Sequence, residues 1–186
     1  MNIGFAMCGS FCTFRNTFPI IEELATQHCL IPILSFNAST IDSRFGTAQS
    51  HIQRLIEICD KPPLRTIAEV EPIGPKKLLD ALIIAPCTGN TLSKLAHSIA
   101  DTPVTMAAKS HLRNGRPILV AVSTNDALAG AAENIGKLLS RKHYYFVPFG
   151  QDDPQGKPAS LVADFNKIPQ ALDAALEGHQ LQPIIL

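Results

Sequence analysis

This sequence lacks an excess of charge of either sign. Lysines and arginines together number 16, as do aspartates and glutamates, and charged residues make up only 17% of the 186 residues. A neutral chain has no electrostatic reason to bind nucleic acid or an anionic membrane. Neutrality near pH 7 also gives little protection against self-association, so the composition is compatible with a homo-oligomer.

Motifs for disulfides, metals and nicotinamide cofactors are also missing. The five cysteines form no CxxC pair, which argues against a disulfide framework and against a zinc site. The six histidines show neither HxxxH nor HxH spacing, so no metal ligand is expected. No GxGxxG phosphate-binding turn follows any apolar run.

No segment indicates secretion or a membrane anchor. No basic region precedes the first apolar run, and the longest apolar runs fall far short of the roughly 20 residues that span a bilayer. We therefore expect a cytoplasmic protein. The apolar content of 46% suits a single domain over residues 1–186 with a full hydrophobic core.

Short apolar runs alternate with segments of helical periodicity. This alternation predicts an α/β, three-layer Rossmann-like (flavodoxin-like) fold, with a parallel sheet and helices on both faces. The polar segment 150–160 is expected to be a surface loop or lid, and the apolar end 182–186 to dock on the body or a partner, or to fray. Strands are expected at 3–8, 30–36, 66–70, 82–85, 117–122 and 144–147, and helices at 18–28, 48–59, 91–100, 105–112, 127–139 and 169–176.

Uncharged hydrogen-bonding residues follow four of the expected strands. Ligands of open α/β sheets bind beyond the carboxyl ends of the strands, so these residues are candidate cofactor contacts. A rim of this kind suits a phosphate held by backbone N–H groups, a polar chain and a ring edge. Helix capping or a plain turn is the alternative for single members of each group. The candidates are Gly9, Ser10, Ser35, Thr88, Gly89, Asn90, Thr91, Ser123, Thr124 and Asn125.

One of these segments carries a resemblance to a known family. Residues 85–96, APCTGNTLSKLA, resemble the A-P-A-[ST]-A-N-T-x-x-K-x-A segment of the flavoproteins that include the homo-oligomeric flavin-containing cysteine decarboxylases and the flavin prenyltransferases. The resemblance extends from Ile3 to the last expected helix. It implies bound FMN, with its phosphate at Gly9 and Ser10, and an assembly built on trimers.

Segments outside the shared motif resemble one branch of that family, the B subunits of dipicolinate synthases. This resemblance implies an oxidoreductase subunit that works with a nicotinamide-binding A subunit. Together they would oxidise dihydrodipicolinate to pyridine-2,6-dicarboxylate in the mother cell of a sporulating bacterium. The missing GxGxxG fits an NAD(P) site on the partner. The matching segments are 40–46, 71–75, 103–109, 122–128 and 145–152.

Two departures from the decarboxylases bear on the reaction. Residues 69–75 lack their histidine, and Ser123-Thr124-Asn125 stands where they carry P-x-M-N. A decarboxylase-like FMN-dependent lyase is therefore one alternative function. A non-catalytic partner that stabilises the A subunit is another.

Candidates for contact with the substrate follow from its chemistry. A dicarboxylate requires cations, and Arg15 and Arg44 are the best placed, with Lys109 next. Glu71 is the candidate general base, since aromatisation removes a proton as a hydride leaves. Asn125 is the second catalytic candidate. Solvated surface charge is the alternative for each charged residue.

Overall fold

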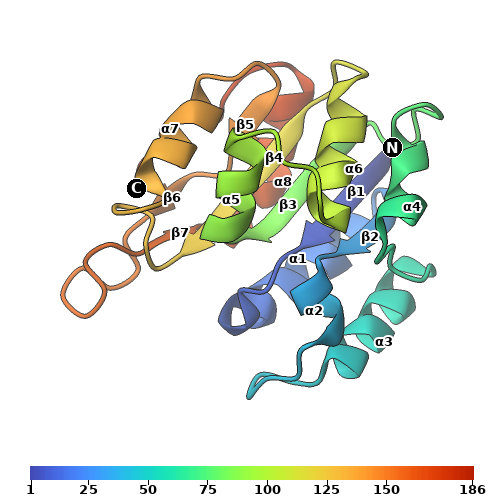
Figure 1. The fold of residues 1–186 in the computed structure, drawn as a ribbon, viewed down its shortest axis with the longest axis horizontal. Coiled ribbons are helices and arrows are strands. Elements are labelled where there is room, and N and C mark those ends of the chain that lie inside the picture. The colour runs from blue at the N-terminus through green and yellow to red at the C-terminus, as the bar shows by residue number, and fades with distance from the viewer.

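The computed structural model describes residues 1–186 and shows a seven-stranded sheet with helices on both faces (Figure 1). Five strands run parallel in the order β2-β1-β3-β4-β5. The central strand β3 is buried at every position, as expected of a parallel strand covered on both faces. The strands are β1 (Asn2–Met7), β2 (Cys29–Leu34), β3 (Ala81–Cys87), β4 (Ile118–Thr124), β5 (Tyr144–Phe146), β6 (Phe149–Gly150) and β7 (Leu161–Ala163).

The helices form two layers. Helix α5 packs against both α6 and α7 on one face, and α1 and α8 pack together on the opposite face (Figure 1). Helix α3 lies beside α1 and β2. The helices are α1 (Phe14–Ala25), α2 (Phe36–Thr40), α3 (Ala48–Cys59), α4 (Ile67–Val70), α5 (Gly89–Ala96), α6 (Pro103–Leu112), α7 (Ala132–Leu139) and α8 (Ile168–Leu176).

The α/β fold with a parallel sheet and helices on both faces is confirmed, and two short antiparallel strands that were not predicted extend it. Strand β7 pairs antiparallel with the end of β4 and with β6, so the sheet is mixed. Both added strands have only two or three residues, too few for a periodicity to show in the sequence. They flank the polar segment 150–160 and fix its two ends beside β4.

Three element assignments also need correction. The expected strand at 66–70 is helix α4, which starts with a capping box between Thr66 and Glu69. The chain turns after β4, so the helix expected from residue 127 begins only at Ala132. Helix α1 begins at Phe14, four residues before the expected start, and carries Pro19 in its interior.

The apolar C-terminal segment docks on the body of the protein. The Phe149 amide donates to the Ile184 carbonyl, and the Leu186 amide donates to the Phe149 carbonyl, each at 3.0 Å. The tail therefore extends the sheet along β6, while the side chains of Ile185 and Leu186 stay exposed. None of the helices combines the length and the hydropathy needed to cross a bilayer.

Candidate functional site

A cleft of about 900 Å³ opens beyond the carboxyl ends of β1, β3 and β4. This is the edge at which open α/β sheets bind ligands, and the volume lies in the range of small-molecule sites. The structure brings most of the sequence-predicted residues together here. Those that line the cleft are Gly9, Ser10, Arg15, Arg44, Thr88, Gly89, Asn90, Ser123, Thr124 and Asn125.

The ends of β1 and β4 are joined by a side-chain hydrogen bond. The Ser10 and Ser123 hydroxyl oxygens lie 2.8 Å apart, and Ser123 is buried. A bond between two hydroxyls fixes the turn after β1 against the end of β4. The two polar strand ends therefore form one continuous wall of the cleft.

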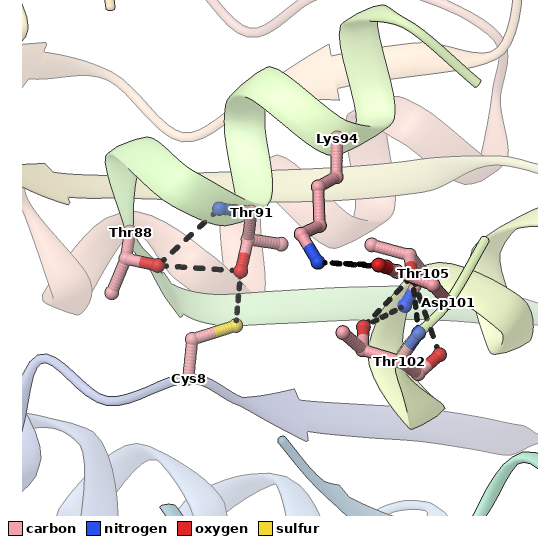
Figure 2. A network of polar contacts seen from close by, with 7 residues as sticks. All are labelled: Cys8, Thr88, Thr91, Lys94, Asp101, Thr102 and Thr105. Atoms are coloured by element: carbon pink, nitrogen blue, oxygen red, sulfur yellow. Dashed lines mark hydrogen bonds and ion pairs between the residues drawn. The ribbon is translucent and has the colours of Figure 1, made fainter. Parts of the chain in front are cut away.

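The start of α5 forms the neighbouring wall. Thr88 is the N-cap, and its hydroxyl accepts from the Thr91 amide at 3.5 Å and donates to the Thr91 hydroxyl at 3.2 Å (Figure 2). Thr91 is itself buried and donates to Cys8 Sγ at 3.3 Å, so it braces α5 against β1 and does not line the cleft. Lys94, one turn on, pairs with Asp101 at 2.7 Å (Figure 2).

Two buried thiols lie beneath this wall. Burial raises the pKa of Cys8 to about 11, and burial raises the pKa of Cys87 well above its usual value. A thiol that stays protonated at neutral pH is a poor nucleophile. Both cysteines are therefore buried packing residues whose thiols stay protonated near neutral pH.

Gly89 has a steric reason to lack a side chain. A Cβ atom there would lie 2.7 Å from Asp126 Oδ1 and 2.9 Å from Thr124 Oγ1. Those two oxygens are 2.5 Å apart, with the Thr124 hydroxyl donating to the Asp126 carboxylate. The first turn of α5 thus packs directly against the polar turn that follows β4.

Positively charged side chains from three segments line the cleft. Arg15 comes from α1, and Arg44 comes from the turn 43–46, with its guanidinium 4.8 Å from the centre of the Phe45 ring. Lys157 comes from the 150–160 loop, where its ammonium lies 3.2 Å from Asp152. The pattern of apolar runs gave no signal for Lys157 or Asp152, because both lie in a segment without periodicity.

The 150–160 loop is tied down by its own side chains. The Ser160 hydroxyl donates to Asp152 at 2.6 Å, and Gln151 Nε2 donates to the Pro158 carbonyl at 2.8 Å. The hydrogen bond from Ser160 and the bond and charge of Lys157 together hold the pKa of Asp152 below its usual value. Asp152 therefore stays ionised and keeps Lys157 beside the cleft.

Besides Thr91, three sequence-predicted residues lie outside the cleft. Ser35 is the N-cap of α2, and its hydroxyl accepts from the Ala38 amide at 3.2 Å. Glu71 is exposed at the start of a short 3₁₀-helix (Glu71–Ile73) that packs on α6. Lys109 is exposed on α6 and borders a separate, smaller cavity between α5 and α6. Ser35 directly follows β2 but uses its hydroxyl to cap α2, and Glu71 and Lys109 stand on elements that do not contribute to the cleft.

Comparison with known proteins identifies the family of this chain. The sequence profile of a family described as Flavoprotein matches residues 1–168. This chain belongs to the Flavoprotein family. Among flavoproteins, it is 43% identical to the dipicolinate synthase B subunit of Bacillus subtilis (strain 168) over 185 residues, which is 99% of this chain and 92% of that protein.

Solved structures agree with this assignment. The crystal structure of the dipicolinate synthase B subunit from Bacillus halodurans C superposes with a TM-score of 0.91 and 42% identity, over 100% of this chain and 95% of that chain. Burkholderia xenovorans DmrB in complex with FMN gives a TM-score of 0.70 at 19% identity, over 95% of each chain. The second likeness supports the flavoprotein fold alone.

Proposed function

We propose that this flavoprotein is the B subunit of a dipicolinate synthase. With a nicotinamide-binding A subunit it oxidises dihydrodipicolinate to pyridine-2,6-dicarboxylate. The observation that carries the proposal is the 43% identity to a dipicolinate synthase B subunit over 99% of the chain. The TM-score of 0.91 to a second protein of that kind supports it, because the full length is shared and not only the flavoprotein motif.

FMN is the cofactor that the cleft would hold. When bound, it supplies a ring that accepts a hydride. The turn at Gly9 and Ser10 and the capped start of α5 offer backbone N–H groups and hydroxyls for a phosphate and a polar chain. The 2.8 Å contact between Ser10 and Ser123 supports a single binding surface.

The charged residues of the cleft suit a substrate with two carboxylates. Arg15, Arg44 and Lys157 offer the cations, and a guanidinium can form two parallel hydrogen bonds with a carboxylate. Glu71 lies outside the cleft, so its proposed role as general base passes to Asp126, whose carboxylate lies in the cleft. Asn125, beside it, is placed to orient the substrate through its amide.

The assembly and location are part of the same proposal. A homo-oligomer built on trimers would carry the flavin sites, and the A subunit would hold NAD(P). The Bacillus subtilis relative is one subunit of a synthase, which supports a partner chain here. The mother cell of a sporulating bacterium is the proposed setting.

Reconstitution tests the function. The purified chain is mixed with the A subunit and substrate, FMN and NAD(P)⁺ are added separately, and product absorbance is followed. We expect a yellow protein and product formation that depends on both chains. A colourless protein that takes up no FMN yet activates the A subunit would instead show a stabilising partner, and carbon dioxide release from a cysteinyl peptide would show a lyase.

A further inference from the structure

A cysteine and a lysine are in unusually close contact on the side of β2 that faces the end of α3. Lys61 Nζ lies 2.6 Å from Cys29 Sγ, although 32 positions separate the two residues. The other hydrogen bond to a sulfur described above, from Thr91 to Cys8, is 3.3 Å long. A nitrogen and a sulfur at 2.6 Å are nearer than such a hydrogen bond places them, and about as far apart as one bridging oxygen atom would hold them.

The backbone on both sides holds this contact in place. The Cys29 amide donates to the Met1 carbonyl at the start of the sheet. Asp60 adopts the left-handed conformation that ends α3, with φ 51°, and turns the chain toward β2. After Lys61, the Leu64 amide donates to the Pro32 carbonyl at 2.9 Å. The contact therefore joins two fixed segments, and Cys29 itself is exposed to solvent.

A second cysteine lies in the same region and offers an alternative partner. Cys59, the last residue of α3, is buried, and burial raises its pKa to about 11, with Lys61 opposing that rise. A thiol that stays protonated at neutral pH is slow to attack an oxidised sulfur. The lysine amine is the group in direct contact with the Cys29 sulfur, at 2.6 Å.

We propose that Cys29 and Lys61 form an oxidative modification site in which one oxygen atom bridges the cysteine sulfur and the lysine nitrogen. Hydrogen peroxide is the oxidant. The Cys29 sulfur attacks one peroxide oxygen, the O–O bond breaks, and a sulfenic acid and one water form. A second peroxide then removes two hydrogens as the neutral Lys61 amine bonds to the sulfenic oxygen, and it leaves as two waters.

The bridge would restrict the segment of chain between Cys29 and Lys61. It closes a loop from residue 29 to residue 61, which contains α2, the turn with Arg44 and Phe45, and α3. A covalent closure of that length restricts the unfolded chain, as a disulfide does. We expect the melting temperature of the full chain to rise by about 5 °C after treatment with hydrogen peroxide.

Peptide mass spectrometry tests the proposal directly. Trypsin releases residues 16–44, with Cys29, and residues 55–65, with Cys59 and Lys61, since Pro62 protects the bond after Lys61. After peroxide treatment and alkylation of free thiols, which include Cys59, we expect these peptides joined, with a mass about 14 Da above the sum of residues 16–44 and alkylated residues 55–65. A joined pair about 2 Da below the sum of the two unalkylated peptides, a Cys29–Cys59 disulfide, would overturn the proposal, as would oxidised Cys29 without joined peptides.

Three variants test which side chains form the bridge. Lys61→Arg keeps the positive charge but removes the amine, so the joined peptides and the rise in melting temperature should both be lost. Cys29→Ser should give the same result. Cys59→Ser should keep the bridge, and its loss in that variant would count against lysine as the partner.

Discussion

The hydroxyl oxygens of Ser10 and Ser123 lie 2.8 Å apart across 113 residues of chain. This contact joins the turn after β1 to the end of β4, the two segments that form one wall of the proposed FMN site. The start of α5 completes the cleft, because Thr91 contacts the end of β1 and Gly89 packs against the turn after β4.

Removing one of these hydroxyls should weaken FMN binding without unfolding the protein. In Ser123→Ala the Ser10 hydroxyl loses its partner and the wall loses its fixed spacing, so we expect FMN affinity to fall about 5- to 10-fold. Fluorescence titration of the apoprotein measures it. Ser140→Ala, which removes a hydroxyl bonded to the Lys137 carbonyl away from the cleft, is the control. Equal affinities in the two variants would contradict the assigned wall.

Two helical glycines should respond in opposite ways to a single methyl group. In Gly89→Ala the new Cβ meets the side-chain oxygens of Asp126 and Thr124 at under 3 Å, so these two cleft side chains must shift, and FMN affinity should fall about 10-fold. Gly136 on α7 has nothing within 4 Å, so Gly136→Ala should stabilise the fold by about 0.5–1 kcal/mol with unchanged affinity. FMN titration and urea unfolding of both variants measure the contrast. Unchanged affinity in Gly89→Ala would refute the close approach.

Arg44 should act on the substrate and not on the cofactor. Its removal takes a cation from the cleft, and we expect the KM of Arg44→Ala to rise about 10-fold or more with unchanged FMN content. Arg54→Ala is matched to it, because Arg54 also stacks on a phenylalanine, with 4.3 Å to the Phe18 ring, but lies outside the cleft. Steady-state kinetics of the reconstituted pair would show the difference, and equal KM values would remove Arg44 from the substrate site.

The position of the general base can be decided by two conservative substitutions. Asp126→Asn keeps the shape of a cleft side chain but removes its proton acceptor, so kcat should fall about 100-fold or more. Glu71→Gln changes a carboxylate outside the cleft and should leave kcat within about twofold. If Glu71→Gln is instead the inactive variant, the base lies in the 3₁₀-helix beside α6 and the cleft assignment for it is wrong.

His111 should make the fold sensitive to mild acid. Burial lowers the pKa of this fully buried ring from 6.5 to about 4, with the Pro117 carbonyl bond opposing. Between these values the unfolded chain binds a proton that the folded chain does not, so stability falls as pH falls from 6.5 to 4, by on the order of 3 kcal/mol. Urea unfolding at several pH values gives the unfolding free energy at each pH. This free energy should change less steeply with pH in His111→Gln than in the parent. Parallel slopes would contradict the prediction.

The sequence predicted the parallel strands well because each is an apolar run, and several, such as β4 at Ser123 and Thr124, end in polar residues. It did not predict β6 and β7, whose pairing depends on the turn geometry of residues 151–160 and not on local periodicity. For the same reason Lys157 and Asp152 were missed as cleft residues. Ser35, Glu71 and Lys109 were selected by their positions along the chain. They differ from Arg44 because Ser35 caps a helix, and Glu71 and Lys109 lie on elements that do not line the cleft.

The docked C-terminal segment also covers an edge of the sheet. Strand β6 would otherwise present the free amide and carbonyl of Phe149, and bare strand edges pair readily with other chains. Residues 184–186 occupy those groups, so the last few residues act as a cover that limits unwanted strand addition. We therefore expect that removing residues 184–186 lowers the solubility of the protein before it lowers the stability of the fold.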